Sequence, residues 1–361
     1  MIRTEIYGFE AFEKLAATWP EIANLDPAAT PFQTLEWQRT WFKHFGSGKK
    51  PLIWTAWSGH DLVALMPFVK VRSPWRALRP MGCGPSDYLQ PIVRPGFEDA
   101  AAAALAEFLV DESRKRLVDV HQLRETLPLA AALAEIAPEA KAFEQATCLV
   151  LELPDTYEAY LKELGKSLRY DVKKLEKPPF TDSRARVTPV GASDAVAGVD
   201  FFFEAHKKRW SKRGLPGAFL GSKIRDFHRE WAVLAAEREW LWMSRLELEG
   251  KPVGAIYAMR KGGTCFFYQS GFDPAHSAIS PGTLLVASTI RRAIEEGLSQ
   301  FDFLRGDEPY KRRWKPQSSY RNLRIMLGSD GVLPKLGERW NRAAFKLESK
   351  VRARFEGKGL R

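Results

Sequence analysis

Side chains capable of acid–base chemistry are concentrated in one segment, Phe301–Pro316, with the sequence FDFLRGDEPYKRRWKP. Two carboxylates, Asp302 and Asp307, precede the phenol of Tyr310 and the ammonium group of Lys311. A carboxylate could act as a general base, a phenol could protonate a leaving group, and a lysine could stabilise an oxyanion or hold a phosphate. We therefore take these four residues as catalytic candidates.

Each candidate in this segment also has a structural interpretation, which the sequence leaves open. Asp302 could cap a turn or pair with Arg305. Tyr310 and Trp314 are four residues apart, so they share a helical face and could be core aromatics. Lys311 begins a run of three basic residues, and such runs are usually solvated surface. We expect Lys311 to be the basic residue of this segment that is most sensitive to substitution.

The elements that position this segment follow from alternating apolar residues and turn signals. A hairpin and a third strand lead through a loop to a helix that begins at Pro281, a favoured first residue for a helix. A strand after the helix ends at the candidate segment, and one more strand follows it. The predicted ranges are Trp240–Leu248, Val253–Arg260 and Thr264–Phe272 for the first three strands, Pro281–Glu296 for the helix, and Gln300–Leu304 and Tyr320–Leu327 for the last two strands.

The first half of the chain shows the same order of elements, which indicates an internal structural repeat. Its hairpin, third strand, helix and following strand are predicted at Leu52–Trp57, Leu62–Val71, Tyr88–Val93, Phe97–Arg116 and Val118–Gln122, with a closing strand at Cys148–Leu153. We expect a first domain at 1–154, a connecting helix at 155–180, a second domain at 181–330 and a basic amphipathic helix at 331–361.

This element order is similar to the GNAT acyltransferase fold. The resemblance implies an α/β protein of two tandem GNAT-like domains, each a mixed, mostly antiparallel sheet flanked by helices. In that fold the third strand and the strand after the helix splay apart. The acyl-CoA lies in the gap with its pyrophosphate on the helix N-terminus, where free N–H groups and the helix dipole favour an anion. Here that place is Ser280-Pro281-Gly282-Thr283.

Within that superfamily, the D-x-x-x-G…Y-K-x-x-W pattern of Phe301–Pro316 resembles tandem acetyltransferases such as the CelD-like proteins of bacterial cellulose and capsule biosynthesis. It resembles the Fem peptidyltransferases less closely. Further stretches agree with this family, namely Phe32–Gly46, Gly84–Tyr88, Ser167–Lys177 and Phe202–Trp210.

The resemblance implies direct transfer of an acetyl or other acyl group from acyl-CoA to an amine or hydroxyl, on a small molecule or a glycan such as an envelope polysaccharide precursor. Two alternatives stay open. One is Fem-like transfer from an aminoacyl-tRNA. The other is an accessory protein that binds nucleic acid or membrane and has lost catalysis.

Binding residues are implied for both substrates. Those for the donor are Gln269, Pro281, Gly282, Thr283 and Arg305. Those for the acceptor are Asp87, Tyr88, His206, Arg209, Trp210 and Trp314. His206 follows Phe202 and Phe203 on a predicted helix, so it could instead be a packed histidine.

Composition limits the remaining possibilities. The 361 residues are 45% hydrophobic, and Lys and Arg exceed Asp and Glu by 55 to 44, giving a net charge of +11. This charge suits anionic partners, but no RNA-binding module is present, so nucleic acid is a weak candidate. Three scattered cysteines indicate a reducing compartment, and no zinc-binding motif suggests a metal.

We expect a cytoplasmic protein without a signal peptide. Its basic 331–361 helix could contact an anionic membrane peripherally or pack on the second domain.

Overall fold

The computed structural model describes residues 2–72, 76–212, 214 and 217–328. These residues form two compact units: the first takes in the described residues up to Thr147 together with 320–328, and the second takes in the described residues of Cys148–Ser319. Each unit is described by itself. The predicted basic helix at 331–361 lies outside the described residues.

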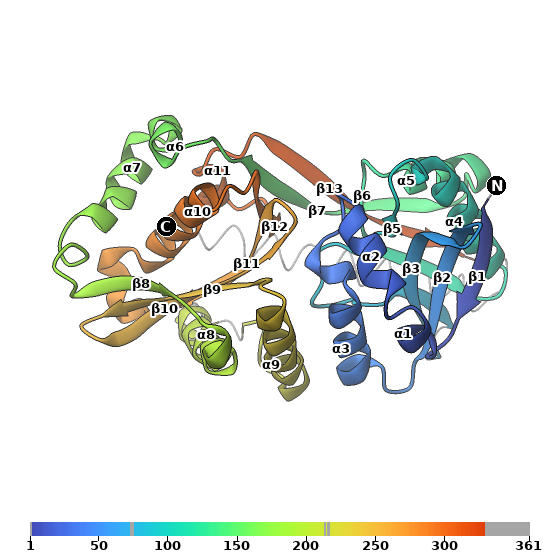
Figure 1. Ribbon diagram of the computed structural model, residues 1–361, viewed down its shortest axis with the longest axis horizontal. Helices are drawn as coiled ribbons and strands as arrows, with labels where there is room; N and C mark the ends of the chain where they lie inside the picture. Colours follow the sequence, from blue (N-terminus) through green and yellow to red (C-terminus); the bar gives the residue numbers. More distant parts are fainter. Residues whose placement is uncertain (1, 73–75, 213, 215–216, 329–361) are drawn as a thin grey trace. The chain divides into compact units, whose positions relative to one another are not determined.

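The first unit contains a mixed sheet with helices packed against it (Figure 1). Its strand order is β1-β2-β3-β4-β6-β13-β7, with β5 paired to β3. The β4–β6 pair is parallel, and the β1–β2, β2–β3, β3–β4 and β6–β13 pairs are antiparallel. The strands are β1 Arg3–Tyr7, β2 Lys50–Ser58, β3 Asp61–Val71, β4 Ala77–Pro80, β5 Ile92–Val93, β6 Leu117–Arg124, β7 Lys141–Glu152 and β13 Ser318–Leu327; the helices are α1 Ala11–Lys14, α2 Thr18–Leu25, η1 Pro31–Gln33, α3 Leu35–Phe45, α4 Glu98–Ser113 and α5 Pro128–Ile136.

The second unit repeats this layout with the strand order β7-β12-β11-β10-β9-β8. The β11–β12 pair is parallel and corresponds to the β4–β6 pair of the first unit. The predicted repeat is therefore confirmed. The strands are β8 Ala185–Pro189, β9 Leu241–Leu248, β10 Lys251–Lys261, β11 Thr264–Phe272 and β12 Gln300–Arg305; the helices are α6 Tyr157–Glu163, α7 Lys166–Val172, η2 Lys173–Glu176, η3 Ala192–Asp194, α8 Ala195–Ser211, α9 Ser222–Glu237, η4 Pro274–Ile279, α10 Pro281–Glu295 and α11 Pro309–Arg312.

Helices cover both faces of the second sheet, with α10 on one face and α8 and α9 on the other (Figure 1). Alternation along β10 explains the arrangement, since successive side chains point to opposite faces. Ile256 packs in the apolar cluster that contains Leu285 and Ile290 of α10. Its neighbour Tyr257 contacts Phe202 of α8 edge-to-face, with ring centroids 5.6 Å apart.

The two closing strands are exchanged relative to the expected domain boundaries. Residues Cys148–Glu152 of β7 pair with β12, so this end of the strand belongs to the second unit. Strand β13, expected to close the second domain, pairs with β6 in the first unit. Alternation predicts that each segment is a strand, but it does not say which sheet edge receives it.

Two further elements differ from the expectation. The connecting helix is broken at Leu164-Gly165 into α6 and α7, whose apolar side chains pack in the same cluster as α10. Gly165 is extended, with φ −61° and ψ 149°, which ends one helix and begins the next. The third strand of the first half is β4, at Ala77–Pro80, while the predicted segment Tyr88–Val93 contributes only the two residues of β5.

Candidate active site

Strands β11 and β12 part within the second sheet. They pair at Thr264–Gln300, Cys265–Phe301 and Phe266–Asp302, and among the described residues the pairing ends there. Each strand carries an irregularity just beyond the last pair. The register of β11 against β10 shifts around Tyr268, and Leu304 of β12 has a φ of 55°. Such bulges increase local twist and end regular pairing, so the two strands diverge.

Helix α10 begins beside this divergence. Its N-cap, Ser280, has a left-handed backbone, and Pro281 occupies the first turn. The first N–H groups of a helix have no intrahelical acceptor. The first turn carries no acidic residue, so nothing within it offsets the positive end of the helix dipole. A Cβ atom on Gly282 would lie 3.2 Å from Cε1 of Phe272, so a glycine lets this turn approach β11 closely.

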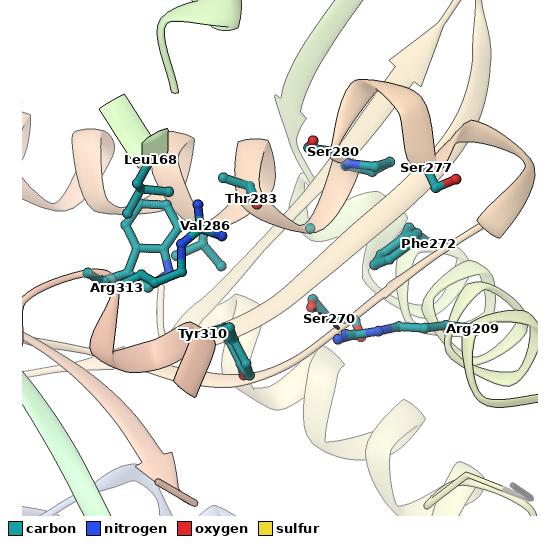
Figure 2. Close-up of a pocket in the computed structure, with 13 residues that line it drawn as sticks. Leu168, Arg209, Ser270, Phe272, Ser277, Ser280, Thr283, Val286, Tyr310 and Arg313 are labelled. Carbon is teal, nitrogen blue, oxygen red and sulfur yellow. Dashed lines mark hydrogen bonds between the residues drawn. The ribbon is translucent and has the colours of Figure 1, made fainter. Parts of the chain in front are cut away.

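A cavity of about 200 Å³ lies between the start of α10 and the end of β11. In Figure 2, Arg209 reaches from α8 toward Ser270 of β11, and Tyr310 borders the same space. The cavity thus combines apolar walls with hydroxyl and guanidinium groups. Its lining residues are Leu168, Arg209, Ser270, Phe272, Ser277, Ser280, Pro281, Gly282, Thr283, Val286, Tyr310, Arg313 and Trp314.

Six predicted site residues meet at this cavity. Pro281, Gly282 and Thr283 form the start of α10, and Tyr310 and Trp314 come from the segment after β12. Arg209 is the sixth; its Nη1 donates hydrogen bonds to the backbone oxygen and to Oγ of Ser270, at 3.0 and 3.1 Å. The guanidinium carbon of Arg209 also lies 5.1 Å from the ring centroid of Phe272.

Lys311 does not line the cavity and is not a solvated residue either. Its side chain is 4% exposed, and Nζ donates to the backbone oxygens of Arg305 and Gly306 at 2.7 and 3.1 Å. Nζ also pairs with Oε2 of Glu308 at 3.0 Å. The ammonium group therefore holds the loop between β12 and α11 in place.

The two candidate bases lie apart from the cavity lining. Asp302 is buried, and its Oδ1 accepts a hydrogen bond from the Leu304 N–H at 2.7 Å, which stabilises the bulge of β12. Asp307 is exposed and pairs with Arg312. Arg305, a donor-binding candidate, is half-buried and supplies the carbonyl that Lys311 binds.

His206 and Gln269 also lie outside the lining. His206 is 2% exposed, and its ring packs 4.9 Å from Phe219 and 5.7 Å from Trp210. Burial, assisted by the charge of Arg209, lowers the pKa of His206 to about 3, so it is neutral at physiological pH. Gln269 pairs across the sheet with Tyr257, on the face that α8 covers.

Asp87 and Tyr88 are buried in the first unit. The Asp87 backbone oxygen accepts from Nδ2 of Asn322 at 2.7 Å, and that of Tyr88 accepts from Nε2 of Gln33 at 3.0 Å. The guanidinium carbon of Arg124 lies 4.1 Å from the centroid of the Tyr88 ring. These contacts fix a loop within the first unit.

The sequence analysis did not identify several of the residues that line the cavity. Ser270 and Phe272 alternate along the end of the predicted strand Thr264–Phe272, so their positions carried a usable signal. Leu168 and Arg313 carried none, because one lies on an ordinary apolar helix face and the other in a basic run.

The described residues offer no candidate for a metal site or for a membrane-spanning helix. No group of three or more His, Cys, Asp or Glu side chains could hold a metal ion there. No helix in that part of the chain is long and apolar enough to cross a membrane.

Comparison with known proteins defines the class. Residues 165–312 match the family of acetyltransferase (GNAT) domains. This part of the chain, which contains α10, the bulged strands and all of the cavity lining except Arg313 and Trp314, belongs to the GNAT superfamily. No curated protein sequence matches the chain.

Solved structures extend the likeness of the fold to most of the chain. The crystal structure of FemX matches with a TM-score of 0.65 and 10% identity, over 89% of this chain and 96% of FemX. The C-terminal domain of a putative lysylphosphatidylglycerol synthetase from Agrobacterium fabrum matches with a TM-score of 0.55 and 12% identity, over 87% and 92% of the two chains. A tandem GNAT protein from the clavulanic acid biosynthesis pathway matches with a TM-score of 0.50 and 13% identity, over 91% and 100%. The predicted tandem GNAT architecture is thus confirmed.

Proposed function

We propose that the second unit transfers an acetyl or other acyl group from acyl-CoA to an amine or hydroxyl group of an acceptor. The observation that carries this proposal is the cavity where β11 and β12 part at the N-terminus of α10. An envelope polysaccharide precursor is our candidate acceptor, and it rests on the resemblance to CelD-like proteins.

The start of α10 supports binding of the donor's pyrophosphate. Free N–H groups and the helix dipole attract an anion there, and no acidic side chain in the first turn opposes it. The hydroxyl groups of Ser277, Ser280 and Thr283 line the same end of the cavity and could donate hydrogen bonds. Nζ of Lys174 lies 3.5 Å from Oγ of Ser280 and adds positive charge.

The rest of the cavity suits the uncharged thioester arm. Leu168, Phe272 and Val286 supply apolar surface, and Arg209 and Ser270 supply polar groups at the end of β11. Ligand sites commonly combine apolar walls with a few fixed polar groups in this way.

The residues around the cavity favour direct transfer over an acyl-enzyme intermediate. No cysteine or histidine is among the lining residues in the described part of the chain. Cys265 of β11 is fully buried, and burial raises its pKa, so it stays a thiol. In direct transfer the acceptor's nitrogen or oxygen attacks the thioester carbon and gives up one proton, the C–S bond breaks, and the thiolate takes up a proton. Tyr310, whose phenol borders the cavity, is our candidate for that proton donor.

Calorimetry with the full-length protein tests the donor class. We expect acetyl-CoA or a longer acyl-CoA to bind, and we expect release of free CoA thiol when an amine- or hydroxyl-bearing glycan precursor is added. An uncharged tRNA and an aminoacyl-tRNA serve as the competing probes. Binding of the aminoacyl-tRNA with no response to any acyl-CoA would replace this proposal with Fem-like transfer.

A further inference from the structure

An exposed aromatic ring lies near the N-terminus of α10. Tyr170 is 67% exposed, the highest value among the exposed large hydrophobic side chains of the described residues. It lies on α7, whose other face is buried through Leu168 and Val172. A tyrosine ring left in water offers a flat surface on which another ring can stack.

Two ammonium groups flank this ring. Nζ of Lys174 lies 5.9 Å and Nζ of Lys177 lies 5.8 Å from its centroid. Tyr170 and Lys174 are four residues apart along α7 and η2, so they lie on one side. Lys177 follows η2 with an extended backbone, and its distance to the ring places its ammonium group beside Tyr170.

Lys174 connects the ring to the proposed donor site. Its Nζ is 3.5 Å from Oγ of Ser280, the residue before α10. The same ammonium pairs with Oδ1 of Asp171 at 2.9 Å, and Arg313 of the cavity lining approaches Oδ2 of Asp171 at 3.6 Å. Lys174 and Arg313 thus share the Asp171 carboxylate, and Lys177 beside the Tyr170 ring adds a third cation, which leaves an excess of positive charge. The other acid nearby in sequence, Glu176, interacts electrostatically with Arg291.

We propose that Tyr170, Lys174 and Lys177 bind the phosphorylated adenosine end of the acyl donor, an inference that rests on the proposed function. The adenine stacks on Tyr170, and the ammonium groups pair with the phosphate on its ribose. An aromatic ring combined with cations suits this ligand, because every nucleobase has a face for stacking and every phosphate is an anion. Lys174 then lies between the pyrophosphate at α10 and the adenosine at Tyr170.

Two kinds of acyl donor carry an adenosine with a phosphate attached to its ribose. CoA carries a terminal 3′-phosphate on its adenosine, and an aminoacyl-tRNA ends in an adenosine that is preceded by a phosphodiester. Acetyl-dephospho-CoA tests the contribution of the 3′-phosphate of CoA, because it keeps the adenine, the pyrophosphate and the thioester arm and lacks only that phosphate.

The experiment is calorimetry on the full-length protein with acetyl-CoA, acetyl-dephospho-CoA and an aminoacylated tRNA minihelix. The variants are Tyr170→Ala and Lys177→Ala, and Lys173→Ala is the matched control, an exposed lysine of the same segment. We expect Tyr170→Ala to weaken acetyl-CoA binding about tenfold or more, in the range of base–aromatic stacking. Lys177→Ala should weaken acetyl-CoA binding and abolish its advantage over acetyl-dephospho-CoA. Lys173→Ala should stay within about twofold of the parent.

The outcomes separate this inference from the proposed function. If the parent binds acetyl-CoA and Tyr170→Ala and Lys177→Ala bind it equally well, the adenosine subsite is wrong and the acyl-CoA donor stands. If the parent binds only the minihelix and Tyr170→Ala weakens that binding, the subsite stands and the acyl-CoA donor is wrong. Binding of none of the three probes by the parent overturns both.

Discussion

The two units share one topology, but they differ at the point where their parallel strands part. In the second unit, β11 and β12 diverge around a cavity. In the first unit, β4 and β6 pair at Ala77–Leu117 and Leu78–Val118, and the chain after β4 returns to the gap. The N–H of Leu89 donates to the oxygen of Gln122 at 3.0 Å, and Tyr88 is fully buried beside it.

The helices that follow the third strand differ as well. Helix α4 of the first unit has two acids, Glu98 and Asp99, in its first turn, whereas the first turn of α10 has none. Carboxylates near a helix N-terminus stabilise the helix, but their negative charge offsets the positive end of the helix dipole that would attract a phosphate. The comparison teaches that topology alone does not open a cavity in this fold. In the second unit the cavity lies beside diverging strands, a short loop and a helix whose first turn has no acids.

The largest effect should come from filling the open divergence. Gly282→Trp would place an indole against Phe272, where even a Cβ atom lies 3.2 Å from the ring, and the cavity has no room for both. We expect acetyl-CoA binding to weaken by roughly a hundredfold or more, which is about 2.8 kcal/mol. Calorimetry measures this, and the circular dichroism spectrum should match that of the parent.

Gly191→Trp is the control for this change, because the nearest neighbour of a Cβ atom there, Oγ of Ser193, is 4.0 Å away. It should bind acetyl-CoA like the parent. A folded Gly282→Trp protein with parental affinity would place the donor site elsewhere.

The next largest effect concerns the loop after β12. Lys311→Ala removes a buried ammonium and leaves two carbonyls and Glu308 without their shared partner. Loss of one member of such a buried set costs about 3 kcal/mol. We expect a clear fall in melting temperature, and a fall in turnover because Tyr310 and Trp314 follow from the same loop.

Arg312→Ala serves as the comparison for Lys311, since the Arg312 side chain is 61% exposed. It should change the melting temperature and turnover little. Equal and small changes in both variants would contradict the structural role of Lys311.

The repeat, the hairpins and the start of α10 could be predicted, because alternation and the run Ser280-Pro281-Gly282 are local signals. The exchange of the closing strands could not, since Cys148–Leu153 and Tyr320–Leu327 alternate equally well and their partners are distant in sequence. The burial of Lys311 was missed for a related reason. A run of basic residues predicts exposed side chains. Only the folded loop before Lys311 presents the carbonyls that accept hydrogen bonds from its ammonium group.

The next largest effect is a pH dependence of stability, to which two buried histidines of the second unit contribute. Burial lowers the pKa values of His206 and His228 to about 3, from 6.5. The unfolded chain therefore binds protons that the folded unit does not, so stability is full above pH 6.5 and falls as the pH decreases toward 3. Each histidine contributes a loss of up to roughly 1.4 kcal/mol per pH unit in that window.

His206→Phe should reduce this loss, because a phenylalanine suits the contacts with Phe202 and Phe219 and takes up no proton. We expect the melting temperature of the parent to fall more steeply between pH 6.5 and 5 than that of the variant. His121 of the first unit, whose pKa burial also lowers, remains in both proteins and does not affect the difference. Parallel curves for the two proteins would show that His206 does not titrate on unfolding.

The smallest effect tests the comparison of the two helices most directly. Thr283→Glu gives the first turn of α10 the acid that α4 carries, and Thr283→Gln supplies the same length without charge. The added carboxylate stabilises the helix through its dipole, so the melting temperature should stay equal or rise slightly. It should also repel the pyrophosphate, and we expect acetyl-CoA to bind about tenfold more weakly than to Thr283→Gln, with the difference shrinking at high salt. These opposite signs separate loss of binding from loss of structure. Equal affinities of the two variants at low salt would mean that the acids of α4 do not explain why the first unit differs from the second.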